Sequence, residues 1–543
     1  MYYYEVLVGD LSYHGKSALT YSSAQQLKRG TVVRIALRDR SVLGIVVDAV
    51  TEPAFTVKPI AAIAEAPPLP AESLRLIDWL YAYYPASFGS VIRLFLPPST
   101  AFPKTNPRQD DTVLPSATAL PELTAEQDNA LRQIQSSGYH LLHGITGSGK
   151  TRVYIELALR TIRENRSAII LTPEIGLTAQ LVRNLEESLS VPVFVLHSRQ
   201  TAAERRDIWY ATLRSSKPIV IIGPRSALFA PLHNLGLIVI DEAHDQAYKN
   251  ENAPYYRTER VAAKLAELHS ACLVSGSATP SVEEYFMASA KKRPILTLQK
   301  LATQNKDQSM KVTTTIVDMR ERSNFTKSTV IGNRLVDVIQ QALANREQAL
   351  LFLNRRGTAG AILCGSCGWQ ALCSHCDLPL TYHGDSHTTR CHVCGRTWPL
   401  PTSCPDSDNT DILLKTIGTK AVVDEAQRLF PGARIHRFDS DVEKSEQIEE
   451  QLTRLQKGSI DIIIGTQMVT KGLDLPKLSV VGVLNADSSL AIPDYSASER
   501  TYQLLTQVIG RTGRGHRHGS VIIQTYKDRR TGRKFVRRTR NRT

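Results

Sequence analysis

Two stretches of the chain repeat the same pattern, in which short apolar runs alternate with longer amphipathic segments. The first series of apolar runs lies at 139–143, 168–171, 193–196, 219–222, 237–240 and 271–275. The second series lies at 349–353, 460–464, 478–484 and 521–525. Short runs that are apolar throughout are typical of strands buried on both faces of a parallel sheet, and the segments between them have helical periodicity. The pattern therefore predicts two α/β lobes, at 122–298 and 299–526.

The first 105 residues have a different pattern. Runs of strand-forming residues at 4–8, 31–37 and 43–50 are followed by an amphipathic helix at 71–84. Residues 1–105 therefore predict a small β-rich domain, joined to the first lobe by a polar linker at 106–121. Its aromatic residues can be read in two ways, as base-stacking side chains or as ordinary core. They include Tyr13, Tyr21 and Phe55.

A glycine-rich segment opens the first lobe and fits the P-loop pattern G-x-x-x-x-G-K-[ST]. It reads Gly144, Ile145, Thr146, Gly147, Ser148, Gly149, Lys150, Thr151. Glycines allow backbone N–H groups to turn toward phosphate oxygens, Lys150 would reach the β- and γ-phosphates, and Thr151 would ligate Mg²⁺. Just upstream, Thr124 and Gln127 fit the N-cap and capping-box positions of a helix, and Gln127 is a further candidate nucleotide contact.

A second motif, Asp-Glu-Ala-His at 241–244, follows the apolar run at 237–240. Acidic residues at the carboxyl end of a parallel strand lie where open α/β sheets bind ligands. Asp241 could hold Mg²⁺, and Glu242 could polarise the attacking water. Alone, the motif could be a capped helix start, but together with the P-loop it predicts ATP hydrolysis.

The formal charge of the chain is +14, and its distribution matters. Residues 527–543 hold nine Lys or Arg and one Asp, a net +8, and subtracting this from +14 leaves +6 for the rest. We therefore expect a basic tail that can contact phosphates without reading sequence. No membrane span or secretory signal is expected from the sequence, which predicts a cytoplasmic protein.

All but one of the eight cysteines lie between Cys364 and Cys404. The pairs Cys364 with Cys367, Cys373 with Cys376, and Cys391 with Cys394 are each separated by two residues. This spacing favours Zn²⁺ binding in a reducing compartment over a disulfide framework. The lone Cys272 lies in an apolar run and is expected to be core.

The order of further motifs resembles that of superfamily 2 helicases. The segments that carry this resemblance are 172–174, 223–226, 275–279, 465–468, 471–474 and 507–514. The exact residues at 354–357, 482–487 and 499–508, and the cysteine insert at 364–407, are similar to the primosomal protein N′ family, the PriA replication-restart helicases. The resemblance implies two RecA-like P-loop helicase lobes, a zinc insert in lobe two and an N-terminal DNA-binding domain.

The same resemblance implies roles for individual residues. Gln507 would join the γ-phosphate and water network, and Arg511 or, preferably, Arg514 would stabilise the charge of the transferred phosphoryl group. Cys373, Cys376, Cys391 and Cys394 would complete one Zn²⁺ site. Cys364, Cys367 and Cys404 would form another with a fourth cysteine, but the sequence has Ser407 there. Asp406, Asp408, a nearby histidine or water could complete that site, or it could be empty.

Three features depart from the family pattern. The positions expected to hold a DNA 3′ end read Leu19-Thr20-Tyr21 and Ala36-Leu37-Arg38. Only the linker lies where the family has a winged-helix domain, and only the basic tail follows residue 526. We therefore expect a chain that lacks the winged-helix and C-terminal domains.

Taken together, the sequence predicts an ATP-dependent 3′→5′ DNA helicase that recognises stalled forks and initiates primosome assembly. The resemblance implies forked and single-stranded DNA, primosome loader proteins, the replicative helicase and single-strand-binding protein as partners. One alternative is a fork-binding primosome scaffold with weak or no unwinding. A second is another superfamily 2 machine, such as an RNA helicase or a restriction translocase, which the cysteine insert disfavours.

Overall fold

The computed structural model divides the chain into two compact units, Met1–Ala302 and Thr303–Thr543. The described residues are 1–15, 17–103, 120–173, 182, 185–187, 191–197, 199–302, 312–353, 360–383, 386–413, 418–438, 459–466, 475, 477–490, 494–510, 512 and 518–526. The predicted linker, apart from its last two residues, and the basic tail lie outside this part of the chain. In the part that is described, no helix is long and apolar enough to cross a membrane.

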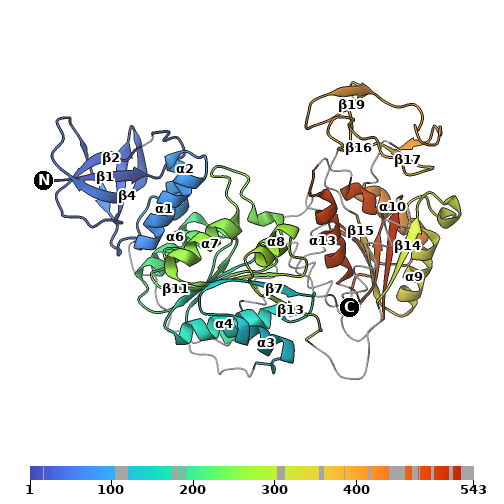
Figure 1. Cartoon of the computed structure of the whole chain (residues 1–543), viewed down its shortest axis with the longest axis horizontal. Helices are drawn as coiled ribbons and strands as arrows, with labels where there is room; N and C mark the ends of the chain where they lie inside the picture. Colours follow the sequence, from blue (N-terminus) through green and yellow to red (C-terminus); the bar gives the residue numbers. More distant parts are fainter. Residues whose placement is uncertain are drawn as a thin grey trace. The chain divides into compact units, whose positions relative to one another are not determined.

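The N-terminal region of the first unit contains a six-stranded sheet, in which β2, β5 and β6 add to the three strands that the sequence pattern predicts (Figure 1). Its strands are β1 (Tyr2–Val8), β2 (Leu19–Ser23), β3 (Val32–Leu37), β4 (Arg40–Val50), β5 (Lys58–Pro59) and β6 (Ala62–Ile63), in the order β5-β2-β1-β4-β3-β6. All neighbours are antiparallel except β2 and β5. Of the three aromatic residues singled out, Tyr21 is buried in the core of this sheet, Tyr13 is half-buried and Phe55 is exposed.

The helicase-like region of the first unit contains a seven-stranded parallel sheet, in the order β13-β7-β12-β11-β8-β10-β9. Its strands are β7 (Gly138–Gly144), β8 (Ser167–Leu171), β9 (Val193–Val195), β10 (Val220–Gly223), β11 (Leu235–Ile240), β12 (Cys272–Ser277) and β13 (Ile295–Leu298). The helices that follow the strands include α3 (Ala125–Gln133), α4 (Lys150–Arg163), α6 (Ala202–Arg214), α7 (Thr258–His269) and α8 (Val282–Ala290).

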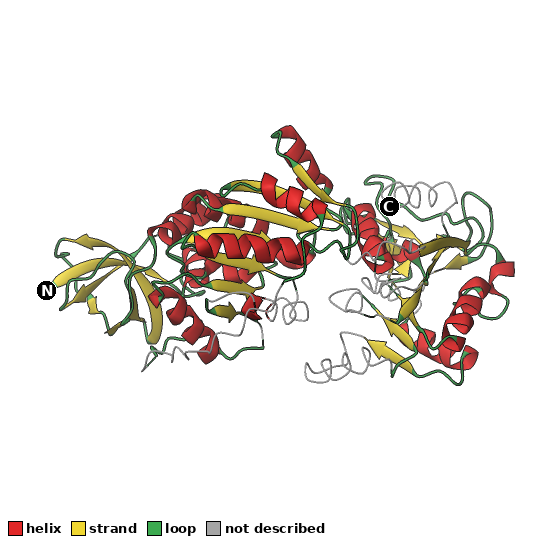
Figure 2. Cartoon of the chain, turned by 90° about the horizontal axis from the view of Figure 1, so that it is seen from below, coloured by secondary structure: helices red, strands yellow, loops and turns green. Residues whose placement is uncertain are grey.

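Alternate residues of these strands pack against helices on opposite faces of the sheet. Ile170 on β8 lies in one apolar cluster with residues of α3 and α4, whereas Ile169 lies in another with residues of α6 and α7. Figures 1 and 2 show helices on both faces of the sheet. Because both faces are covered, the strands are apolar throughout, which is the signal that the sequence pattern carries.

The apolar cluster that contains Ile169 and residues of α6 and α7 continues from the sheet of the first lobe into the N-terminal region. That region contributes residues of α1 (Ala71–Tyr83), α2 (Phe88–Ile92) and the 3₁₀ turn η1 (Arg93–Phe95). Phe95 packs edge to face on Phe229 with ring centroids 5.2 Å apart, and Phe102 packs on Tyr210 at 6.3 Å. Aromatic pairs at these separations bury large apolar areas. The N-terminal region and the first lobe therefore share one hydrophobic core.

The second unit contains a six-stranded parallel sheet, in the order β14-β25-β24-β15-β23-β22. The strands are β14 (Val312–Asp318), β15 (Gln348–Phe352), β22 (Ile435–Phe438), β23 (Ile462–Gly465), β24 (Leu478–Val483) and β25 (Gly519–Thr525). Helices α9 (Asn333–Ala344) and α10 (Thr419–Leu429) pack on one face, and α13 (Ala497–Ile509) packs on the other. The two parallel sheets confirm the predicted α/β class.

The cysteine-rich insert leaves the second lobe after β15 and forms two small sheets of its own. One is the antiparallel sheet β16 (Gly360–Ala361), β18 (Thr381–His383), β19 (Thr388–Arg390) and β20 (Thr397–Pro399). The other pairs β17 (Leu363–Cys364) with β21 (Ile412–Leu413), where the chain leaves and re-enters the insert. The buried core of the insert is small and includes two cysteines, Cys373 and Cys391.

Candidate active site and metal centre

The predicted phosphate loop connects β7 to α4, as its sequence context requires. Gly147 and Gly149 have φ values of 85° and 77°, which L side chains rarely adopt. Gly144 approaches its surroundings closely, because a Cβ there would lie 2.6 Å from Ser148 Oγ. The glycines of the motif are therefore used for backbone conformation and close approach, which are the properties that a phosphate loop needs.

Lys150 is buried at the start of α4, and its ammonium group is directed back across the loop. Its Nζ donates a hydrogen bond to the Gly144 carbonyl oxygen at 3.0 Å and lies 3.9 Å from Glu242 Oε1. The structure thus brings together the first motif and the Asp-Glu-Ala-His motif. Thr151 is the next residue of α4 and is half-buried.

Asp241 and Glu242 directly follow β11, two strands from β7 in the sheet. Carboxyl ends of parallel strands meet at one edge, which is why motifs far apart in sequence converge here. Burial and, next, the charge of Glu242 raise the pKa of Asp241 to about 6, against the opposing effect of Lys150. The two neighbouring carboxylates offer oxygen ligands of the kind that Mg²⁺ takes, and the Lys150 ammonium suits phosphate oxygens.

Two tyrosines hold Asp241 in place, and neither was identified from the sequence. Tyr154 on α4 donates from its hydroxyl to Asp241 Oδ1 at 3.0 Å, and Tyr248 donates to the Asp241 carbonyl oxygen at 2.7 Å. Both tyrosines are fully buried. A Cβ at Gly276 would collide with the Tyr154 hydroxyl, so the strand that carries the Ser-Ala-Thr segment leaves room for this tyrosine.

His244 connects the acidic motif to the Ser-Ala-Thr segment at the end of β12. Its Nδ1 lies 2.6 Å from Ser277 Oγ and 3.6 Å from Glu242 Oε2. Ser277 Oγ in turn accepts a hydrogen bond from the Thr279 N–H at 2.9 Å. Burial lowers the pKa of His244, so the imidazole is held toward its neutral form. Glu242, His244, Ser277 and Thr279 therefore lie in one continuous series of close contacts.

Gln127 lies beneath the phosphate loop and is buried. Its Nε2 donates to the Ser148 carbonyl oxygen at 3.0 Å, while its Oε1 accepts from the Thr124 N–H at 3.0 Å. The bond from the Thr124 N–H and the bond from the Gln127 N–H to Thr124 Oγ1 confirm the predicted capping box. The amide thus supports the loop, and direct contact between Gln127 and a nucleotide stays a prediction.

The candidate residues of the second lobe are described only in part. Gln507 lies near the end of α13. Arg511 and Arg514 lie outside the described residues, so their proposed contacts stay predictions from the sequence.

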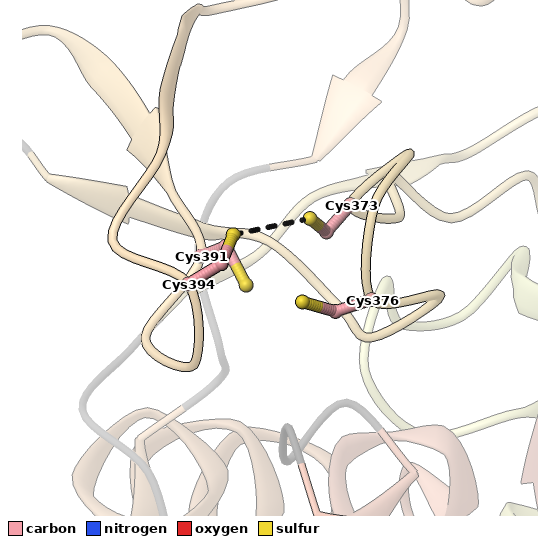
Figure 3. A group of neighbouring side chains, drawn as sticks. All are labelled: Cys373, Cys376, Cys391 and Cys394. Atoms are coloured by element: carbon pink, nitrogen blue, oxygen red, sulfur yellow. Dashed lines mark hydrogen bonds between the residues drawn. The ribbon is translucent and has the colours of Figure 1, made fainter.

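Four cysteines converge in the insert from two separate turns (Figure 3). The sulfur atoms of Cys373, Cys376, Cys391 and Cys394 all lie within 4.8 Å of one another, with Cys373 and Cys394 3.7 Å apart. The backbone N–H groups of Cys394 and Val393 lower the pKa of Cys391 to about 7, whereas burial and the neighbouring thiols raise the pKa of Cys376 to about 12. Four converging sulfurs are the donor set of a structural Zn²⁺ site.

Cys364, Cys367 and Cys404 form a second, three-cysteine cluster, whose sulfur atoms also lie within 4.8 Å of one another. Cys367 Sγ and Cys404 Sγ are 3.4 Å apart, and Cys364 Sγ lies 3.6 Å from Ser407 Oγ. The structure therefore places Ser407 at the fourth corner, as the resemblance implies. Among the described residues, no histidine or acidic side chain joins this cluster, so Asp406 and Asp408 do not complete it.

Known family models match four parts of the chain. Four family models match, described as a DEAD/DEAH box helicase at residues 124–287, a PriA 3′ DNA-binding domain at 10–97, a helicase conserved C-terminal domain at 407–516, and a PriA DNA helicase Cys-rich region at 373–399. The last match includes the four-cysteine cluster and omits the three-cysteine cluster.

Curated relatives share substantial identity. The replication restart protein PriA of Bacillus subtilis is 40% identical over 411 residues, which cover 74% of this chain and 50% of the relative. The protein of that name from Rickettsia conorii is 34% identical over 513 residues, or 92% of this chain and 77% of the relative. The chain spans about half the length of the first of these relatives.

Among solved structures, RecG bound to a three-way DNA junction matches with a TM-score of 0.45 and 18% identity, over 78% of this chain and 45% of that one. The DUF1998 helicase MrfA bound to DNA matches with a TM-score of 0.47 and 16% identity, over 77% and 48%.

Proposed function

This chain belongs to the replication restart protein PriA family, and from that premise we propose that it is an ATP-dependent 3′→5′ DNA helicase. Its proposed role is to recognise stalled replication forks and to initiate primosome assembly. The observation that carries the proposal is the meeting of Lys150 and Glu242 behind the phosphate loop, 3.9 Å apart.

The chemistry follows from the charges at this edge of the sheet. Lys150 and the loop N–H groups would bind the β- and γ-phosphates of ATP, and Thr151 and Asp241 would hold Mg²⁺, which would neutralise charge on the phosphate oxygens. Glu242 is proposed to orient and deprotonate the attacking water, because its carboxylate lies 3.9 Å from the Lys150 ammonium, which is proposed to bind the phosphates. Gln507, Arg511 and Arg514 are proposed to complete the γ-phosphate contacts.

Movement on DNA requires that hydrolysis changes a DNA-contacting segment. The contacts from Glu242 through His244 and Ser277 to Thr279 support such a connection within the first lobe. We propose that this chain of contacts transmits the state of the γ-phosphate to the Ser-Ala-Thr segment. The N-terminal region, which matches a 3′ DNA-binding domain, is proposed to hold DNA at forks. Its shared core with the first lobe would keep that DNA at a fixed position relative to the lobe.

The proposed partners follow from family membership. They are forked and single-stranded DNA, primosome loader proteins, the replicative helicase and single-strand-binding protein. The cysteine insert is the proposed docking and strand-separating element, held by Zn²⁺ at the four-cysteine cluster.

ATP turnover without nucleic acid, with single-stranded DNA, with forked DNA and with RNA tests the proposal. We expect DNA to raise turnover at least about tenfold, which corresponds to a barrier lower by about 1.4 kcal/mol, and RNA to have little effect. Equal stimulation by RNA would favour an RNA helicase. Fork binding with a flat turnover would favour a primosome scaffold that does not unwind.

The hydrogen bond from Tyr154 predicts a change in the pH dependence of turnover. Its hydroxyl lowers the pKa of Asp241, so Tyr154→Phe should raise that pKa and leave less of the carboxylate ionised at pH 6. At limiting Mg²⁺ we expect a several-fold loss of turnover at pH 6, little loss at pH 8, and an acid limb displaced to higher pH. Turnover of the wild type and of Tyr154→Phe, measured against pH at several Mg²⁺ concentrations, gives the position of the acid limb in each.

Tyr210→Phe is the matched control, because Tyr210 is a buried tyrosine of the same lobe packed against Trp209 and Phe102 instead of the carboxylates. Its acid limb should coincide with that of the wild type. An unmoved limb in Tyr154→Phe would show that Tyr154 serves packing alone.

A further inference from the structure

Four turns of the insert have the same backbone geometry, although the last of them lacks a second cysteine. In each turn the N–H of the first cysteine donates to the carbonyl five residues on, and the N–H four residues on donates back to that cysteine. The first set of bonds is Cys364 to Trp369, Cys373 to Leu378, Cys391 to Arg396 and Cys404 to Asn409, at 2.8 to 2.9 Å. The returning N–H groups belong to Gly368, Asp377, Gly395 and Asp408.

The same four residues share a left-handed conformation, with φ values from 52° to 79°. In the three turns with two cysteines, the chain reverses so that the sulfur three positions after the first cysteine lies within 4.8 Å of the first sulfur, and each turn presents two metal ligands. The residue at that position is Cys367, Cys376 or Cys394 in these turns. In the fourth turn it is Ser407. The fourth turn therefore keeps the backbone of a metal-binding turn with an oxygen donor in place of sulfur.

The position of the Ser407 hydroxyl is that of a ligand. Its Oγ lies 3.6 Å from Cys364 Sγ, within the range of the sulfur–sulfur distances of 3.4 and 3.7 Å in the two clusters. Tetrahedral Zn²⁺ with sulfur at about 2.3 Å and oxygen at about 2.0–2.2 Å places its ligands roughly 3.5–3.8 Å apart. Since no carboxylate or imidazole among the described residues joins the cluster, the Ser407 hydroxyl is the oxygen in place.

We propose that Cys364, Cys367, Cys404 and the Ser407 hydroxyl form a second Zn²⁺ site that releases its metal much faster than the four-thiolate site. A neutral hydroxyl is a weaker ligand than a thiolate, and three thiolates carry one negative charge fewer than four. The inference does not depend on the helicase activity proposed above. It concerns how firmly these side chains retain Zn²⁺, the metal that the cysteine insert would hold.

The location of this cluster gives the proposal a structural consequence. Cys364 lies in β17, which pairs with β21 where the chain leaves and re-enters the insert. The Cys367 carbonyl oxygen accepts a hydrogen bond from Arg320 at 3.4 Å, and a Cβ at Gly368 would collide with the Tyr526 carbonyl oxygen. Arg320 and Tyr526 flank the parallel sheet of the second lobe. The labile site thus lies at the attachment of the insert, whereas the four-thiolate site lies within its own core.

Zinc retention by the full chain tests the proposal. Protein purified with added Zn²⁺ is challenged with EDTA, and bound Zn²⁺ is measured against time by mass spectrometry. We expect two Zn²⁺ before the challenge, and loss of one at least about 10- to 100-fold faster than the other. Ser407→Cys should slow the fast loss to the rate of the first site, and Ser407→Ala should make it faster still.

Ser403→Cys is the matched control, because Ser403 is an exposed neighbour of Cys404 outside the ligand position. It should leave the fast loss unchanged. Co²⁺ substitution gives a second readout, since the visible ligand-field bands of Ser407→Cys should become those of two four-thiolate sites. One Zn²⁺ in the wild type at saturating metal, equal loss from both sites, or identical loss in wild type and Ser407→Ala would each overturn the proposal.

Discussion

Replacing Lys150 with alanine is expected to lower ATP turnover by at least about 10²-fold while DNA binding stays unchanged. The Lys150 ammonium links the phosphate loop to the Asp-Glu-Ala-His motif. It donates to the Gly144 carbonyl oxygen and lies beside the Glu242 carboxylate. Without it, the charge that develops on the transferred phosphoryl group loses a preorganised partner in a buried site. Turnover with and without single-stranded DNA measures the effect.

Lys217→Ala is the control for this prediction. Lys217 is exposed on the same lobe, after α6 and away from the phosphate loop, so its removal should leave turnover unchanged. DNA affinity and the thermal unfolding midpoint of Lys150→Ala show whether the fold is retained. If that variant turns over ATP at the wild-type rate, the assignment of the active site is wrong.

The other large effect is expected at the four-cysteine cluster. Cys391→Ala should remove the Zn²⁺ of this cluster and unfold the part of the insert around it, because the small core there contains Cys373 and Cys391 themselves. Structural Zn²⁺ contributes about 10–16 kcal/mol of apparent free energy in small zinc-dependent domains, more than such a core can replace. We expect new protease cleavage between residues 364 and 413, loss of duplex unwinding, and DNA-stimulated turnover within about twofold of the wild type.

Cys272→Ala gives the comparison for a cysteine that has no metal role. Cys272 lies buried in β12, where burial raises its thiol pKa to about 12. Its replacement should preserve both the Zn²⁺ content and the protease pattern of the insert. Unwinding that survives in Cys391→Ala would mean that the insert does not separate strands.

The sequence was most informative where one continuous segment carries the signal. The phosphate loop and the acidic motif are such segments, and the rule that carboxyl ends of parallel strands share an edge predicts their meeting. The contact of Tyr154 with Asp241 joins residues 87 positions apart. Whether a helical side chain reaches a particular carboxylate depends on how the helix packs, and no local pattern records that.

The strands that sequence reasoning missed lie mainly at sheet edges. β13, β14 and β22 each end their sheet, and in β14 and β22 most residues are exposed or only partly buried. An edge strand has one neighbour and needs fewer apolar residues, so its apolar run is short or broken by polar positions. The turn at Ser407 could not be predicted from cysteine spacing, because its backbone hydrogen bonds also involve Asp408 and Asn409.

The core shared by the N-terminal region and the first lobe determines how this protein can be dissected. A fragment that begins at the phosphate loop would lose the partners of Phe229 and Tyr210, and would expose a continuous apolar surface to water. Surfaces of that kind cause aggregation in isolated fragments. Recombinant truncations meant to yield the first lobe as a folded unit should therefore keep the N-terminal region, with the cut placed after Ala302, where the first compact unit ends.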